Sequence, residues 1–152
     1  MKKSVLGILF SGAMLAGSAN AANITVYFSP SCPHCHHAYE FISNNLIYEY
    51  PNITVTMVSV MEQSNRQDFA NALNKCKYQS GGVPVIVVGE KCFQGYADFM
   101  QDQLREAVAV DLDANAVAVA AENKKAMETD ADAFRKSHAN NKGVITEKKN
   151  NQ

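Results

Sequence analysis

The sequence lacks an excess of charge of either sign. Its 152 residues include 14 lysines and arginines against 15 aspartates and glutamates, which gives a formal net charge of −1. Domains that bind nucleic acids carry a basic patch or stripe, and nothing in this chain suggests one. The composition therefore predicts that nucleic acid is not a partner.

A long hydrophobic run is also missing. The uncharged, mostly apolar stretch over residues 5–17 is shorter than the ~20 residues that a membrane-spanning helix needs. It follows Met1-Lys2-Lys3 and precedes Ala19-Asn20-Ala21, the charge and small-residue pattern of a bacterial signal peptide. We expect residues 1–21 to be cleaved and the rest to be exported to the periplasm, without stable membrane insertion. An uncleaved anchor is the alternative.

Cysteine is absent after Cys92, and large apolar side chains become scarce from residue 111. Residues 22–110 hold the apolar pattern of one small domain, near the lower size limit for a single core. Residues 111–152 are rich in alanine, asparagine and lysine. We expect this tail to form at best a solvated helix over residues 115–136, with disorder from there to residue 152.

Four residues stand out among those that are present: Cys32-Pro33-His34-Cys35. They follow the apolar run at residues 24–28, where a buried strand would hand over to a helix. Pro33 suits the first helical position. The sulfur of Cys32 would then lie near unpaired backbone N–H groups and the positive end of the helix dipole, which favour the thiolate. The spacing predicts a redox-active dithiol in which Cys32 reacts with the client and Cys35 resolves the mixed disulfide.

Two other interpretations of these cysteines exist. The pair could be a purely structural disulfide, or Cys32 and Cys35 could bind copper or zinc together with His36 and His37. Neighbouring helical side chains diverge by about 100°, so both histidines do not easily join one site. We therefore predict no metal site and expect both histidines at the surface.

Cys76 and Cys92 have no motif spacing. In a small exported domain two such cysteines most often pair, and the bridge would contribute roughly 2–4 kcal/mol to stability. The alternatives are two buried thiols or a second redox pair that exchanges electrons with Cys32.

The period of the apolar pattern changes along the chain in a definite order. Strands are expected over 24–28, 53–60, 83–88 and 92–93. Helices are expected from residue 33 to before Pro51, from a capping box formed by Ser64 and Gln67, and over 98–110. The buried face of the last helix is expected to consist of Phe99, Leu104, Ala107 and Val108. This order, β-α-β-α-β-β-α, predicts an α/β fold with a four-stranded mixed sheet and flanking helices.

A Cys-x-x-Cys motif between the first strand and the first helix of such an order resembles the thioredoxin superfamily. Gly82-Val83-Pro84-Val85 stands where that superfamily carries a cis proline facing the dithiol. The resemblance covers residues 23–110. It implies a thioredoxin-like fold, activity as a thiol–disulfide oxidoreductase without a cofactor, and substrate binding at Val83 and Pro84.

Within the superfamily the sequence resembles two groups. Cys-Pro-His-Cys is similar to the DsbA-type periplasmic oxidases, in which the histidine, here His34, stabilises the reduced thiolate and makes the disulfide oxidising. The short segment at residues 61–82 is similar to glutaredoxins. So is Val26, which occupies a position where thioredoxins place a carboxylate for proton transfer. This implies proton transfer through water or His34.

The resemblance to the periplasmic oxidases also implies partners. These are client proteins with thiols or disulfides and a membrane protein that resets the redox state of the dithiol. We expect an oxidase, with a periplasmic thiol reductase as the alternative. A glutathione site is not carried over, because Gly95-Tyr96-Ala97-Asp98 matches the glutaredoxin pattern only in part.

Overall fold

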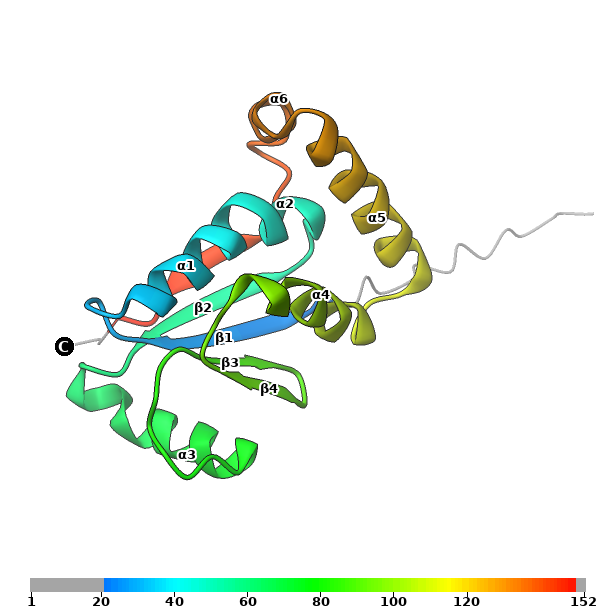
Figure 1. Ribbon diagram of the computed structural model, residues 1–152. Coiled ribbons are helices and arrows are strands. Elements are labelled where there is room, and N and C mark those ends of the chain that lie inside the picture. Colours follow the sequence, from blue (N-terminus) through cyan, green and yellow to red (C-terminus); the bar gives the residue numbers. More distant parts are fainter. Residues whose placement is uncertain (1–20, 150–152) are drawn as a thin grey trace, which may run out of the picture.

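A single mixed sheet organises the chain. The computed structural model describes residues 21–149, so the predicted signal peptide lies outside the described residues except for Ala21. The strands lie side by side in the order β4-β3-β1-β2-β5 (Figure 1). β1 pairs in parallel with β2, and β2 with β5, whereas β3 is antiparallel to both β1 and β4. The strand bounds are β1 Asn23–Phe28, β2 Thr54–Ser59, β3 Val85–Val88, β4 Lys91–Gln94 and β5 Val144–Glu147.

The helices connect these strands in the predicted order. α1 (Pro33–Phe41) continues through a π-helical stretch (Ile42–Leu46) into α2 (Ile47–Glu49), just before Pro51. α3 (Arg66–Cys76) links β2 to β3, and α4 (Gln101–Val110) follows β4. Residues 23–110 thus have the order β-α-β-α-β-β-α, and the predicted fold class is confirmed. The fold is thioredoxin-like.

The sheet separates two apolar layers, because neighbouring residues of a strand point to opposite faces. Val26, Met57 and Ile86 belong to the larger core cluster, which also contains Ala38 and Phe41 of α1 and the buried residues of α4. Tyr27 and Val85 belong to a smaller cluster with residues of α3. Figure 1 shows α1 and α4 on one side of the sheet and α3 on the other. The burial pattern therefore assigns each strand residue to one of two faces.

The C-terminal segment differs from the prediction. It forms α5 (Ala114–Thr129), α6 (Ala131–Ser137) and the edge strand β5, so the sheet has five strands and not four. Ala120 and Met127 of α5 are buried in the main core. The prediction of disorder after residue 136 is therefore wrong for the part that the structure describes. The edge of β2 supplies the backbone hydrogen-bonding partners of β5, and the composition of residues 111–152 does not indicate this pairing.

Polar contacts hold this segment on the domain. The side-chain amide of Asn123 donates to the carbonyl oxygens of Tyr48 and Glu49, at 3.3 and 3.1 Å, where α2 ends. The backbone N–H of Gly143 donates to the carbonyl of Ile47 at 2.7 Å. These bonds satisfy carbonyl groups at the helix end that otherwise have no partner within the helix.

Two local predictions are also corrected. The helix predicted to begin at the Ser64 capping box is α3, and its N-cap residue is Asn65, at the end of a 3-10 turn over Gln63–Asn65. The Asn65 side chain does not cap the helix but donates to the carbonyl of Ser59 at 3.1 Å. Phe99 is 78% exposed, whereas Leu104, Ala107 and Val108 are buried as expected. Phe99 lies in a 3-10 turn (Asp98–Met100), where about 120° separates neighbours, so the α-helical period does not apply to it.

Candidate active site

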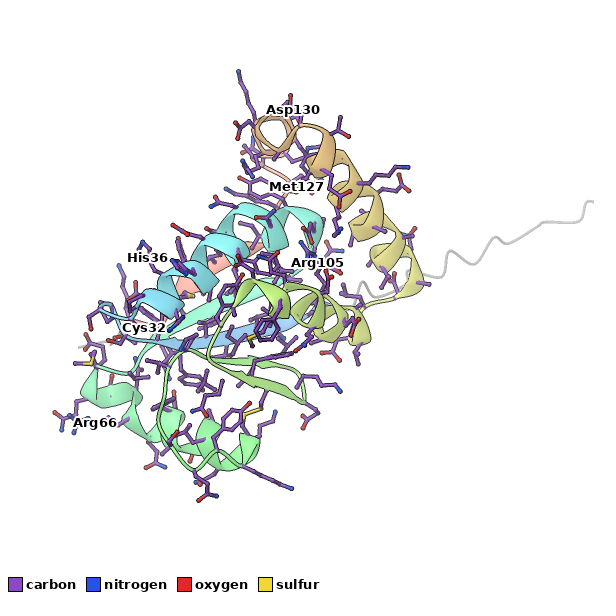
Figure 2. The ribbon with its side chains drawn as sticks, in the orientation of Figure 1. Cys32, His36, Arg66, Arg105, Met127 and Asp130 are labelled. Atoms are coloured by element: carbon purple, nitrogen blue, oxygen red, sulfur yellow. A yellow bond between two sulfur atoms is a disulfide. The ribbon has the colours of Figure 1, made fainter. Side chains whose placement is uncertain are left out.

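The turn between β1 and α1 positions the two cysteines. The N–H of Cys32 donates to the carbonyl of Ser29 at 3.1 Å, and Pro33 begins the helix. Cys32 is the N-cap residue with an extended backbone, and its sulfur accepts the backbone N–H of Cys35 at 3.1 Å. Figure 2 shows Cys32 at the start of α1. The sulfur therefore lies at the positive end of the helix, where negative charge is stabilised.

The two sulfurs differ in accessibility. Cys32 and Cys35 form a disulfide with their Cα atoms 5.2 Å apart. Cys32 is partly exposed, whereas Cys35 is only 4% exposed and packs toward the core. An incoming thiolate can therefore reach Cys32 but not Cys35.

A proline loop lies against the exposed sulfur. The peptide bond between Val83 and Pro84 is cis, as the resemblance implies. The Cys32 sulfur lies 3.6 Å from the carbonyl oxygen of Val83, across 51 positions of sequence. The side-chain amide of Gln94 donates to the Gly82 carbonyl at 3.0 Å and so supports the loop. The structure thus brings together the dithiol and the Val83-Pro84 pair.

A pocket of about 230 Å³ opens beside the disulfide. Its walls come from the β1–α1 turn, the first turns of α1, and strands β2 and β5. His34, for which proton transfer was expected, is exposed and does not line it, whereas His36 does. The lining residues are Phe28, Ser29, Pro30, Cys32, Cys35, His36, Tyr39, Met57 and Glu147.

Sequence reasoning missed Glu147 because it lies in the segment taken as disordered. The three consecutive β-branched residues Val144-Ile145-Thr146 are the one signal that could have indicated a strand there. Four residues are too few for that signal to stand out against the polar composition around them.

The comparisons with known proteins are sparse. No family model matches the chain, and no curated protein matches it. Among solved structures, a glutaredoxin from Archaeoglobus fulgidus is similar to 60% of this chain and 88% of its own, with 21% sequence identity and a TM-score of 0.43. The thioredoxin-like fold is assigned from the element order and strand pairing of the chain itself.

The other cysteines lie away from this pocket. Cys76 at the end of α3 and Cys92 on β4 form a disulfide with Cα atoms 5.7 Å apart. This is one of the three arrangements that the sequence left open. The bridge ties the end of α3 to β4, across 16 positions of sequence.

A buried ion pair fixes the far end of the first helical segment. The guanidinium of Arg105 on α4 donates to both carboxylate oxygens of Glu49, at 2.7 and 2.8 Å. The hydrogen bonds that Arg105 donates to Glu49 hold the pKa of Arg105 above its ordinary value. Arg105 also lies over the ring of Phe41, 5.0 Å from its centroid. These contacts hold α1 and its extension against α4.

Two further observations concern residues 21–149. No helix there is both long and apolar enough to cross a bilayer. No group of three or more histidine, cysteine, aspartate or glutamate side chains is arranged to hold a metal ion in the same part of the chain. His36 and His37 are both exposed.

Proposed function

We propose that this protein is a thiol–disulfide oxidoreductase that exchanges disulfides with client proteins through Cys32 and Cys35. One observation carries the proposal. Cys32 is partly exposed, and its sulfur accepts the Cys35 N–H at the helix start and lies against the Val83 carbonyl, while Cys35 is buried. A purely structural disulfide needs none of these features.

The reaction follows from the difference in exposure. A client thiolate attacks the Cys32 sulfur, the Cys32–Cys35 bond breaks, and Cys35 leaves as a thiolate that takes up a proton. A second client thiolate then attacks the client sulfur of the mixed disulfide and releases Cys32. The client loses two electrons and the dithiol gains them. The reverse sequence reduces a client disulfide.

We favour oxidation of clients as the working direction. Stabilising the Cys32 thiolate makes the reduced form more stable and the disulfide a stronger oxidant. The Cys35 N–H and the helix end supply part of this stabilisation, and an imidazole N–H of His34, in the first turn, would add to it by donating to the thiolate. Replacing His34 by alanine should therefore lower the reduction potential.

The direction is tested by equilibration with a glutathione buffer. A reduction potential close to that of thioredoxin, about −270 mV, would contradict the oxidase assignment and favour a thiol reductase. A potential well above that of glutaredoxins, about −200 mV, would support it.

Export to a bacterial periplasm fits this function. The pattern in residues 1–21 supports it, and so does the Cys76–Cys92 disulfide, because structural disulfides persist in oxidising compartments. The partners would be exported clients and a membrane protein that reoxidises the dithiol. Cell fractionation and N-terminal sequencing test this, with Ala22 expected as the first residue and a cytoplasmic fraction contradicting it.

The reaction is tested by trapping its intermediate. A full chain with Cys35→Ala should accumulate mixed disulfides with exported proteins, and a matched Cys32→Ala chain should accumulate none. If Cys35→Ala traps nothing, or Cys32→Ala traps as much, the assigned roles are wrong. Elemental analysis of the reduced protein separates this function from the alternative of copper or zinc binding, and we expect no stoichiometric metal.

A further inference from the structure

We propose that Glu147, from the C-terminal strand β5, is the proton-transfer partner of Cys35. The inference rests on the proposed function and adds the residue that handles the proton of the buried thiol. Four observations lead to it: the burial of Cys35, the row of side chains that contains Glu147, the way β5 is held, and the composition of the pocket.

The first observation is that Cys35 is only 4% exposed. Burial in apolar surroundings disfavours a thiolate. Cys35 nevertheless becomes a thiolate when it leaves Cys32, and must be one when it attacks. A group that gives and takes its proton nearby would therefore accelerate both directions. Val26 on β1 is apolar and fully buried, so it offers no such group.

The second observation is a single row of side chains across the sheet. Val26 pairs in register with Met57, and Met57 pairs in register with Glu147. Partners in parallel strands point to the same face of a sheet. Val26 and Met57 both belong to the core on the α1 side. Glu147 therefore points to the α1 face, on which Cys35 lies, two strands from Val26.

The third observation is that the residue after Glu147 is held by its backbone and by its side chain. The next residue, Lys148, donates its backbone N–H to the Met57 carbonyl at 2.8 Å. The Lys148 side chain points to the opposite face and forms a salt bridge with Asp68 of α3. This alternation places one charge on each side of the sheet, and the exposed Glu147 is the one of the two that lines the pocket beside the dithiol.

The fourth observation is the composition of the pocket wall. Its titratable side chains are Cys32, Cys35, His36, Tyr39 and Glu147. Glu147 is thus the carboxylate that shares a cavity with both sulfurs. His36 follows Cys35 directly on α1 and diverges from it by about 100°. A pocket of about 230 Å³ also has room for a water that relays the proton.

The step balances as follows. When the dithiol reduces a client, Cys35 gives its proton to the Glu147 carboxylate, and the resulting thiolate attacks the Cys32 sulfur of the mixed disulfide. The client sulfur leaves as a thiolate, so the client gains two electrons and the dithiol loses two. In oxidation, Cys35 leaves as a thiolate and takes the proton back from the Glu147 carboxyl group.

The test measures this step alone. The mixed disulfide of Cys32 with thionitrobenzoate is prepared at acid pH on the full chain and then brought to neutral pH in a stopped-flow instrument. Release of thionitrobenzoate reports the attack by Cys35. Glu147→Gln should slow the release at least about tenfold near pH 7, and the difference should shrink toward about pH 9, where hydroxide removes the proton. Glu147→Gln should not change the rate at which Cys32 attacks the reagent, which is measured in chains that also carry Cys35→Ala.

Two matched variants serve as controls. Glu40→Gln removes the same charge from an exposed position on α1 that does not line the pocket, and His36→Gln removes the imidazole that lines the pocket next to Cys35. Glu40→Gln should not slow the release as Glu147→Gln does, and His36→Gln should slow it less than Glu147→Gln; an equal or larger effect of His36→Gln would assign the proton transfer to His36 and overturn the inference. If Glu147→Gln releases at the wild-type rate, or Glu40→Gln slows equally, the inference is wrong. If the wild-type mixed disulfide does not resolve, the proposed function itself fails.

A second readout does not depend on turnover. In a Cys32→Ser chain, the ultraviolet absorbance of the Cys35 thiolate is titrated against pH. A neighbouring carboxylate disfavours a thiolate, so Glu147→Gln should lower the pKa of Cys35. A purely structural role of Glu147 would not produce this direction of shift, and an unchanged or raised pKa contradicts the inference.

Discussion

Replacing Met127 by alanine tests whether the C-terminal helices belong to the folded domain. Met127 on α5 is 6% exposed and lies in the main core. Truncating a buried methionine to alanine costs about 2–5 kcal/mol in free energy of unfolding, depending on how well the site can collapse. Met127 also lines an open hollow of about 400 Å³ between α4 and α5, so the surroundings can relax. We therefore expect a loss of about 2–3 kcal/mol.

The assay is urea unfolding followed by far-ultraviolet circular dichroism, with linear extrapolation to water. Val119→Ala on the same helix is the control, because Val119 is 41% exposed and should cost less than about 1 kcal/mol. The m-value should not change, since the same surface is exposed on unfolding. A Met127→Ala loss no larger than that of the control would refute the reasoning, and would mean that α5 is not packed on the sheet domain.

Three further predictions concern β5, the second disulfide and alkaline pH. A β-carbon on Gly143 would lie 2.8 Å from Cγ1 and 2.9 Å from the carbonyl oxygen of Ile53. Gly143→Ala should therefore cost about 1–3 kcal/mol, displace β5 and slow Cys35 attack on the thionitrobenzoate adduct; a wild-type rate and stability would contradict this. Replacing both Cys76 and Cys92 by alanine opens a loop of 16 residues and should lower the free energy of unfolding by about 3 kcal/mol. Client exchange should persist, and its loss would point instead to a second redox pair. Burial raises the pKa of four tyrosines above 10.0 in the folded state, so this contribution to stability is complete below that pH and is lost as the pH rises through the folded values. Urea unfolding at about pH 9 and about pH 11 should show the decrease, and equal stabilities would contradict it. The four are Tyr27, Tyr50, Tyr78 and Tyr96.

Local sequence determined the dithiol and the elements that carry it. The apolar run before Cys32, the proline at the first helical position and the two-residue spacing act within about ten residues, so the strand, the turn and the helix could be predicted together. The same holds for the order of the elements up to residue 110, because most of them have enough residues to show their own period. Pro84 was predicted as the residue facing the dithiol from a resemblance and not from any local signal.

Tertiary structure decided the rest of the pocket. β5 has only four residues. They form a strand because they pair with the edge of β2, some 90 positions earlier in the sequence. The two buried side chains of α5 likewise pack into a core that distant parts of the chain form. Asn123 holds α5 there through its hydrogen bonds to the carbonyls of Tyr48 and Glu49. Glu147 lines the same pocket as Cys35 because its strand pairs in register with Met57 of β2, a pairing that no short window of the sequence indicates. The local sequence thus determines the chemistry of the two sulfurs, whereas long-range strand pairing brings Glu147 into their pocket.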